Sequence, residues 1–190
     1  MRSRPSGTRG DSRGITTLHH WRTCNVVAVT IALLASGCVK PAAWKLEAAG
    51  VRVTSVADGD TLTVSDSAGF PTVVRLLGID APEVAHDDQP AECGADTAKQ
   101  ALTDLVNGRR VNLLTDPGSD RTDRYGRLLA YVEATQIDDV AKQLLSHGLV
   151  IAWYPKSAAR PSRADAYETT QTAAKASGVG SWAKCSNFPR

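Results

Sequence analysis

The sequence predicts an α+β fold in which five strands form a small β-barrel and three helices pack around it. Five short segments carry the alternating or branched apolar pattern of strands, and three longer segments have apolar residues at helical spacing. Their order along the chain is three strands, a helix, two strands and two helices. This order matches a five-stranded barrel with a helix between its third and fourth strands.

The first three strands are predicted before residue 80. Val51–Ala57 alternates apolar and polar residues, Thr61–Val64 continues the pattern, and Thr72–Ile79 is rich in branched side chains. The run Asp66-Ser67-Ala68-Gly69 is typical of a turn between the second and third strands. Gly78, inside the third strand, indicates a bulge or a bend.

The remaining elements follow in the second half of the chain. The apolar spacing predicts a helix over Ala91–Val106, and then two strands, Arg110–Leu114 and Leu128–Glu133. Two further amphipathic helices are predicted over Ile137–His147 and Arg163–Ala176, and a glycine follows shortly after each.

Residues 1–37 are predicted to be a signal peptide of the lipoprotein type. A basic stretch precedes the uncharged apolar run Val26–Ala35, which is about half the roughly 20 residues of a membrane-spanning helix. The following segment, Leu34-Ala35-Ser36-Gly37-Cys38, resembles a bacterial lipobox, which implies that Cys38 carries a lipid. An ordinary cleaved signal and an uncleaved anchor are the alternatives.

This organisation predicts a location for each part of the chain. Residues 38–48 are predicted to be a tether and residues 49–190 a folded domain. The protein is expected to be exported to a bacterial cell envelope, with the membrane reached through the lipid on Cys38, or to be secreted.

The overall charge gives no support for nucleic-acid binding. The whole chain has a formal charge of +2, from 22 basic and 20 acidic residues. Without the five arginines and one aspartate of residues 1–37, there remain 17 basic and 19 acidic residues, a net charge of −2. Any phosphate-binding site must therefore be a local cluster.

The four cysteines have different expected fates. Cys24 leaves with the signal peptide and Cys38 takes the lipid, so Cys93 and Cys185 remain in an oxidising compartment. A disulfide between them is expected on these grounds, and two buried free thiols are the alternative. A zinc site is excluded because the cysteines lack metal-ligand spacing.

Three short segments hold most of the unusual polar residues. They are Asp58–Thr61 (DGDT), Arg75–Glu83 (RLLGIDAPE) and Asp123–Arg127 (DRYGR). The first alone is also typical of a tight hairpin turn. Together they bring carboxylates, which suit calcium, and arginines, which match phosphate oxygens in a bidentate fork. These are the groups that phosphodiester hydrolysis uses.

These three motifs resemble those of the staphylococcal nuclease family, in the same order and over most of the mature chain, from about Val51 to Trp182. The resemblance implies an OB-fold barrel with three helices and a monomeric protein. It also implies a calcium-dependent endonuclease that hydrolyses phosphodiester bonds of DNA and RNA and leaves 3′-phosphates.

The resemblance assigns a metal site. Asp60 and Asp80 match the carboxylate ligands of calcium, Ala81 matches the residue that offers its backbone carbonyl, and Asp58 is expected to act on the metal through a water molecule. Glu83 matches the general base that activates water.

The resemblance also assigns the groups that bind the substrate. Arg75 and Arg127 match the two catalytic arginines that bind phosphate. Arg124 and Tyr125 match residues that hold a terminal phosphate of the bound nucleotide, with Arg124 in place of the more common lysine. Tyr154, or its neighbour Trp153, is expected to lie near the nucleotide as an aromatic platform.

Two other functions fit parts of the sequence. One is a non-catalytic OB-fold envelope lipoprotein that binds nucleic acid or another anionic ligand. The other is a structural envelope lipoprotein, which would have no need of the acidic cluster. The joint presence of Arg75, Glu83 and Arg127 favours the nuclease.

Overall fold

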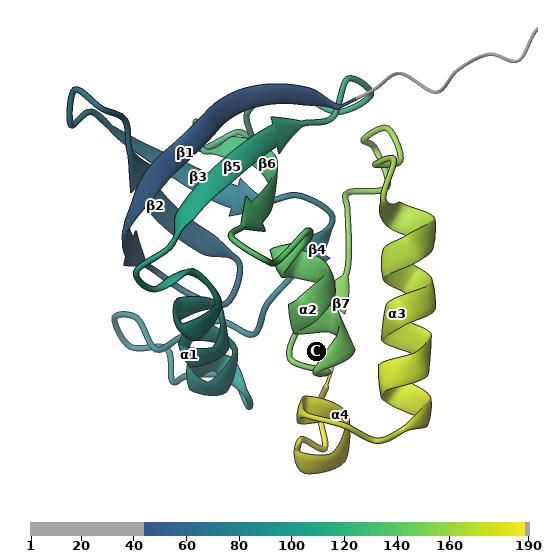
Figure 1. Cartoon of the computed structure of the whole chain (residues 1–190). Helices are drawn as coiled ribbons and strands as arrows, with labels where there is room; N and C mark the ends of the chain where they lie inside the picture. Colours follow the sequence, from purple (N-terminus) through teal and green to yellow (C-terminus); the bar gives the residue numbers. More distant parts are fainter. Residues whose placement is uncertain (1–43, 189–190) are drawn as a thin grey trace, which may run out of the picture. The chain divides into compact units, whose positions relative to one another are not determined.

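A five-stranded barrel forms the centre of the molecule in the computed structural model, which describes residues 44–188 (Figure 1). Its strands are β1 (Lys45–Val56), β2 (Thr61–Ser65), β3 (Pro71–Leu76), β5 (Arg110–Thr115) and β6 (Leu128–Ala134). They close in the order β1-β2-β3-β6-β5, with β3 and β6 parallel and the other pairs antiparallel. The α+β barrel predicted from the sequence is confirmed.

The long strand β1 closes the barrel because it pairs along its length with two different neighbours. Its first part pairs with β5, its second part pairs with β2, and register shifts occur near Ala48 and Val53. Gly50 has a φ of 61°, a backbone conformation that favours glycine, and its N–H donates to the side chain of Asn112 on β5. These irregularities bend β1 around the barrel.

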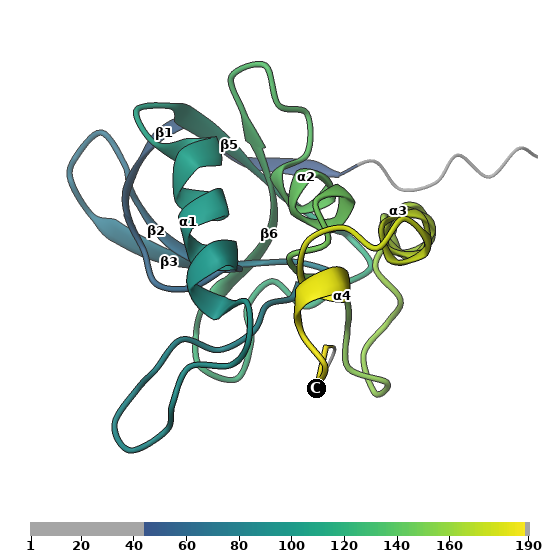
Figure 2. The same ribbon diagram turned by 90° about the horizontal axis from the view of Figure 1, so that it is seen from below.

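Helix α1 (Ala95–Val106) lies across one opening of the barrel (Figure 2). Its buried face includes Ala98, Leu102 and Val106, which join the apolar core formed by the inward-facing residues of the strands. Leu62 on β2 and Val111 on β5 are completely buried in this core. The helix therefore closes the core and also presses against the turn that follows β1.

The other elements lie beside the barrel. They are helices α2 (Val140–Ser146), α3 (Ala164–Ala176) and α4 (Ser181–Lys184) and the short strands β4 (Ile79–Asp80) and β7 (Ile151–Ala152). The two short strands pair antiparallel, Ile79 with Ala152 and Asp80 with Ile151. This pairing places the segment after α2 directly beside the end of the second polar motif.

A buried polar network fixes the start of α3 to the barrel. The Asp116 carboxylate accepts hydrogen bonds from the Tyr131 hydroxyl, at 2.7 Å, and from the backbone N–H and the hydroxyl of Ser162. The Arg163 guanidinium lies 4.1 and 4.3 Å from the rings of Trp44 and Tyr131. It also pairs with Asp139, whose side chain caps α2. Residues far apart in the sequence thus hold the helices on the barrel.

Several element boundaries differ from the sequence predictions. β1 begins at Lys45, so residues 45–48 belong to the barrel and not to the predicted tether. The predicted strand Thr72–Ile79 divides into β3 and β4 because Gly78 has a φ of 87° and turns the chain. Helix α1 begins at Ala95 and α2 at Val140, each later than predicted.

Part of the sequence prediction falls outside the described residues. The signal peptide, Cys38 and residues 38–43 of the tether lie there, so these predictions stay as they are. Among the helices of residues 44–188, none is long and apolar enough to cross a bilayer.

Candidate active site

The first polar motif forms a tight turn between β1 and β2 that is pressed against two other elements. A Cβ placed on Gly59 would lie 2.6 Å from the Cβ of Ala98 on α1 and 2.8 Å from the Cβ of Ala81. The Asp58 carboxylate accepts a hydrogen bond from the backbone N–H of Asp60, at 2.9 Å. Only glycine allows this approach, and the approach carries the Asp60 side chain to the second motif.

Asp60, Arg75 and Asp80 meet at one point. One guanidinium nitrogen of Arg75, Nη2, lies 3.0 Å from an oxygen of Asp60 and 2.7 Å from an oxygen of Asp80. The other, Nη1, donates to the backbone carbonyls of Leu76 and Ile79. Because four acceptors surround it, Arg75 is held rigidly where the turn after β3 brings the two carboxylates together.

Asp60 is the most buried acid of this cluster. Its side chain is 7% exposed, and it accepts further hydrogen bonds from the Ala81 backbone N–H and the Thr61 hydroxyl. Burial raises the pKa of the Asp60 carboxyl above its ordinary value, and the Arg75 charge opposes that rise. A single guanidinium therefore does not fully offset the cost of burying this carboxylate.

Arg127 joins the same cluster through Thr61. Its Nε donates to Asp123 at 2.7 Å, and its Nη1 lies 3.4 Å from the Thr61 hydroxyl, which in turn donates to Asp60 at 2.9 Å. A line of polar contacts therefore connects Arg127 to Arg75 past the first residue of β2. Nε and Nη1 of Arg127 are thus engaged by residues of the described chain, which leaves Nη2 as the nitrogen that can donate to a further acceptor.

The sequence predictions assigned no role to Thr61 or Asp123. Both act by orienting a charged group: Thr61 bridges the two halves of the site, and Asp123 accepts from the backbone and the side chain of Arg127. Two signals were available in the sequence: the Thr61 hydroxyl stands next to Asp60, and Asp123 stands four residues before Arg127. The contact from Thr61 to Arg127 depends on how separate segments approach, and the bond from Asp123 to Arg127 depends on the turn of the third motif, which the sequence predictions did not resolve.

Tyr125 and Arg124 lie at the exposed edge of the site. The Tyr125 side chain is 67% exposed, and the guanidinium groups of Arg124 and Arg127 lie 4.7 and 5.4 Å from its ring centre. Nη2 of Arg124 also donates to the Tyr125 hydroxyl. The third motif thus presents two cations and one aromatic ring on a single loop.

Glu83 is exposed and follows Asp80 by three residues, after Ala81 and Pro82. Its backbone N–H donates to the side chain of Glu92 at 2.9 Å, and its carbonyl accepts from the Glu92 N–H. Glu92, which the sequence predictions did not include, therefore fixes the backbone that carries Glu83.

The donor set fits a calcium ion. Asp60 and Asp80 offer carboxylate oxygens at one point. The backbone N–H of the adjacent Ala81 donates to Asp60, which brings this residue to the same point. Within residues 44–188, no three Asp, Glu, His or Cys side chains come together as a metal-binding group, and Asp58 is engaged with the backbone of its turn. Two carboxylates completed by a carbonyl and water suit calcium, which accepts such ligands.

Trp153 and Tyr154 follow β7, the short strand that pairs with β4 of the second motif. The backbone N–H of Trp153 donates to the carbonyl of Gly78, and its side chain is 46% exposed. The Tyr154 hydroxyl accepts from Arg160, which also lies 5.6 Å from the Tyr154 ring centre. The Trp153 backbone is therefore bonded to the second motif, and Tyr154 as the residue that faces the nucleotide stays a prediction.

A disulfide joins the C-terminal segment to the region before α1. It links Cys93 to Cys185 over a sequence separation of 92 residues. Cys93 is exposed and Cys185 half-buried. The bond brings the residues after α4 to the edge of the second polar motif.

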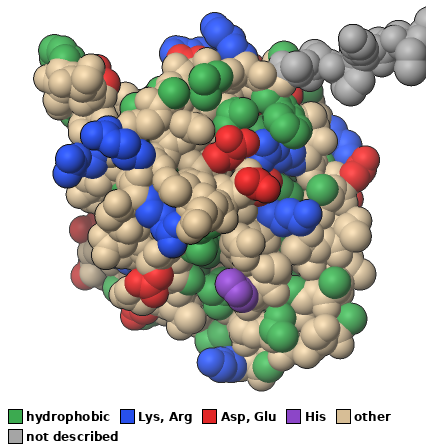
Figure 3. Space-filling view, viewed as in Figure 1, with side chains coloured by type: hydrophobic (Ala, Val, Ile, Leu, Met, Phe, Trp, Pro, Cys, Tyr) green, Lys and Arg blue, Asp and Glu red, His purple; other side chains and the backbone are tan. Residues whose placement is uncertain are grey.

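Basic side chains stand apart from one another on one face of the described protein. On the face shown in Figure 3, Lys and Arg stand in separate groups, and several have acidic side chains beside them. This agrees with the negative net charge of the chain beyond residue 37. An anionic ligand that binds on this face would therefore depend on a local group of basic side chains.

Comparisons with known proteins show which family this chain resembles. Residues 73–184 match the family model described as staphylococcal nuclease homologue. Curated relatives include a probable endonuclease LCL3 of Arthroderma otae, 30% identical over 69% of this chain and 55% of the relative. Others are a probable endonuclease LCL3 of Phaeosphaeria nodorum, 33% identical over 68% and 43%, and the SPbeta prophage-derived endonuclease YokF of Bacillus subtilis, 32% identical over 73% and 45%. The chain spans about half the length of the curated relatives it matches.

Proposed function

This chain belongs to the family of staphylococcal nuclease homologues, and on that premise we propose that it is a calcium-dependent endonuclease acting on DNA and RNA. The observation that carries the proposal is the convergence of Asp60 and Asp80 on Arg75, with Arg127 joined to them through Thr61. Two hard carboxylates beside two guanidinium groups form a site for a divalent cation and a phosphate diester.

Each group of the site has a chemical task in the proposed reaction. Asp60, Asp80 and the Ala81 carbonyl would hold the calcium ion, which when bound would supply positive charge against the negative charge of the transition state. Arg127 binds a non-bridging phosphate oxygen through Nη2 while Asp123 fixes its orientation. Arg75 contacts phosphate once the two carboxylates release its Nη2.

Glu83 acts as the general base in this proposal. Its carboxylate takes a proton from water as the water oxygen bonds to phosphorus, and the bond from phosphorus to the 5′ oxygen breaks. The departing 5′ oxygen takes a proton from solvent, and Glu83 later returns its own proton to solvent. The products are a 3′-phosphate and a free 5′-hydroxyl. A positioned base of this kind contributes about 10²–10⁴-fold to a rate. Because Glu92 holds the Glu83 backbone at two points, the base is carried on a fixed segment.

Digestion of single- and double-stranded DNA and RNA during a calcium titration tests the proposal. Cleavage is expected to rise with calcium, to stop in excess chelator, and to fall by at least about 100-fold in Glu83→Gln. Asp88→Asn, which removes a carboxylate from the exposed loop that follows Glu83, is the matched control and should cut as wild type. Cleavage that persists in chelator would reject the metal. A strand that is bound but never cut would support the non-catalytic alternative.

Export is a separate part of the proposal and depends on residues 26–38. We expect Cys38 to carry a lipid and the domain to reach the cell envelope. Membrane fractionation of wild type and Cys38→Ala tests this. Recovery of both proteins in the same soluble fraction would reject lipid anchoring and leave secretion as the alternative.

A further inference from the structure

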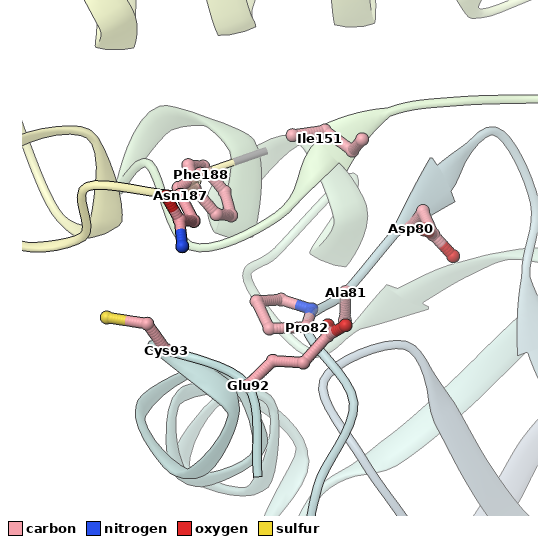
Figure 4. A pocket seen from close by; sticks show the side chains of 8 residues that line it. All are labelled: Asp80, Ala81, Pro82, Glu92, Cys93, Ile151, Asn187 and Phe188. Carbon is pink, nitrogen blue, oxygen red and sulfur yellow. The ribbon is translucent and has the colours of Figure 1, made fainter. Parts of the chain in front are cut away.

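A cavity of about 270 Å³ lies beside the metal-binding end of the proposed site (Figure 4). One side of it is formed by Asp80, Ala81 and Pro82 of the second motif. The opposite side is formed by Asn187 and Phe188, from the segment that follows the disulfide. Two distant parts of the chain thus enclose a space that adjoins the carboxylates next to Arg75.

The chemistry of the walls suits a flat, uncharged group. Pro82, Ile151 and the Phe188 ring supply apolar surface, and the Asn187 amide supplies both a donor and an acceptor. Asp80 and Glu92 line the cavity, and no Lys or Arg of the described chain does. A phosphate is therefore disfavoured there. A nucleobase is neutral, flat and edged with donors and acceptors.

The size of the cavity points to the same occupant. It is slightly below the roughly 300–1,000 Å³ of pockets that bury a whole drug-sized ligand, so it accommodates one ring system better than a complete nucleotide. A strand whose phosphate lies at Arg75 and Arg127 has to continue past Asp80 or Tyr125. The cavity is directly next to Asp80.

The C-terminal wall is built to stay in place. Phe188 packs edge-to-face against Trp182, with ring centres 4.7 Å apart, and Trp182 belongs to α4. The disulfide anchors Cys185 to Cys93, which is itself a lining residue. The Phe188 ring is therefore held by Trp182, and the chain that carries it is anchored three residues earlier by the disulfide, as a stacking platform requires.

We propose that this cavity is a nucleobase subsite, in which Phe188 stacks on a base next to the scissile phosphate and Asn187 contacts the edge of that base. The inference rests on the proposed function, because it takes the ligand to be a nucleic-acid strand. It assigns a specificity role to the C-terminal segment, which none of the three polar motifs includes.

Binding of a labelled eight-nucleotide DNA single strand, measured by fluorescence anisotropy in excess chelator, tests the subsite. Phe188→Ala is expected to weaken binding by about 5- to 100-fold, as the loss of one base–aromatic stack does. Phe188→Trp should retain it. The chain has two phenylalanines, so Phe70→Ala, 71% exposed on the turn between β2 and β3, is the matched control and should bind as wild type.

A strand of the same length that lacks bases separates stacking from a general disturbance of the site. Phe188→Ala should bind this abasic strand as wild type does, whereas a variant with a damaged fold would lose both strands alike. Equal loss for both strands, or no loss for either, would overturn the subsite while leaving the nuclease proposal intact. If wild type binds neither strand and cuts no nucleic acid, the proposed function fails and the subsite fails with it.

Discussion

Removal of the Arg75 guanidinium should lower the stability of the fold as well as the rate of cleavage. Its side chain is 12% exposed, and its partners on Asp60 and Asp80 are 7% and 20% exposed. Deleting one partner of a buried ion pair costs about 3–5 kcal/mol, because the other charge is left buried without compensation. The pair with Asp80 is more exposed and contributes little to this cost. We therefore expect Arg75→Ala to lower the unfolding free energy by about 3–5 kcal/mol.

The measurement is urea and thermal unfolding at neutral pH in excess chelator. For a domain of this size the expected loss corresponds to a fall in Tm of about 6–20 °C. Arg52→Ala, at an exposed position on β1, is the matched control and should change the unfolding free energy by less than about 0.5 kcal/mol.

A double-mutant cycle with Asp60→Asn identifies the cause. Without the Asp60 charge, losing Arg75 leaves no buried carboxylate uncompensated, so the cost of Arg75→Ala should drop by about 1–3 kcal/mol. If the two substitutions are additive to within about 0.5 kcal/mol, Arg75 does not stabilise the Asp60 charge, and the electrostatic account of this cluster is refuted.

Three further expectations follow from single contacts. Thr61→Val removes the hydroxyl that lies between Arg127 and Asp60, so kcat/KM for DNA should fall by about five- to tenfold, with a loss of about 0.5–1.5 kcal/mol in unfolding free energy. An unchanged rate would show that this contact does not orient Arg127. Gly59→Ala places a Cβ 2.6 Å from that of Ala98, and should cost about 1–3 kcal/mol in urea unfolding, less in an Ala98→Gly background. Burial raises the pKa of Asp116, but its hydrogen bonds outweigh burial and lower the pKa below 3.8. Its stabilising effect is therefore present above pH 3.8 and lost as the pH falls through the lower folded value, so Asp116→Asn should show a shallower loss of stability below about pH 4 than wild type.

The order of strands along the chain could be predicted because each central strand has a local pattern. Thr61–Ser65 and Leu128–Ala134 alternate buried and less buried residues over part of their length, and glycine-containing turns separate the elements. The start of β1 left no such pattern. Residues 45–50 are rich in alanine and end at Gly50, a composition with low β-propensity, and they are a strand because β5 supplies hydrogen bonds. β4 and β7 have two residues each, too few for any period to be seen.

The site residues were predictable to the extent that they belong to a contiguous motif. Asp60, Arg75 and Asp80 stand in motifs that resemble a known family, and the structure brings these three together. Glu92 and Asn187 belong to no motif. Their positions beside Glu83 and Ala81 follow from the path of the chain before α1 and from the disulfide, which no local pattern encodes.

Charge pairing within the site explains how an acidic domain can be proposed to bind nucleic acid. Arg75 faces Asp60 and Asp80, and Arg127 faces Asp123, so each of these two cations is held by carboxylates of the protein itself. A phosphate must compete with those carboxylates for the guanidinium groups, and a divalent cation bound by Asp60 and Asp80 would release Arg75 for it. Calcium would then favour the binding of phosphate, and phosphate would favour the binding of calcium. Dependence on the cation and binding of the substrate would both follow from this exchange of partners by Arg75, without a basic surface elsewhere.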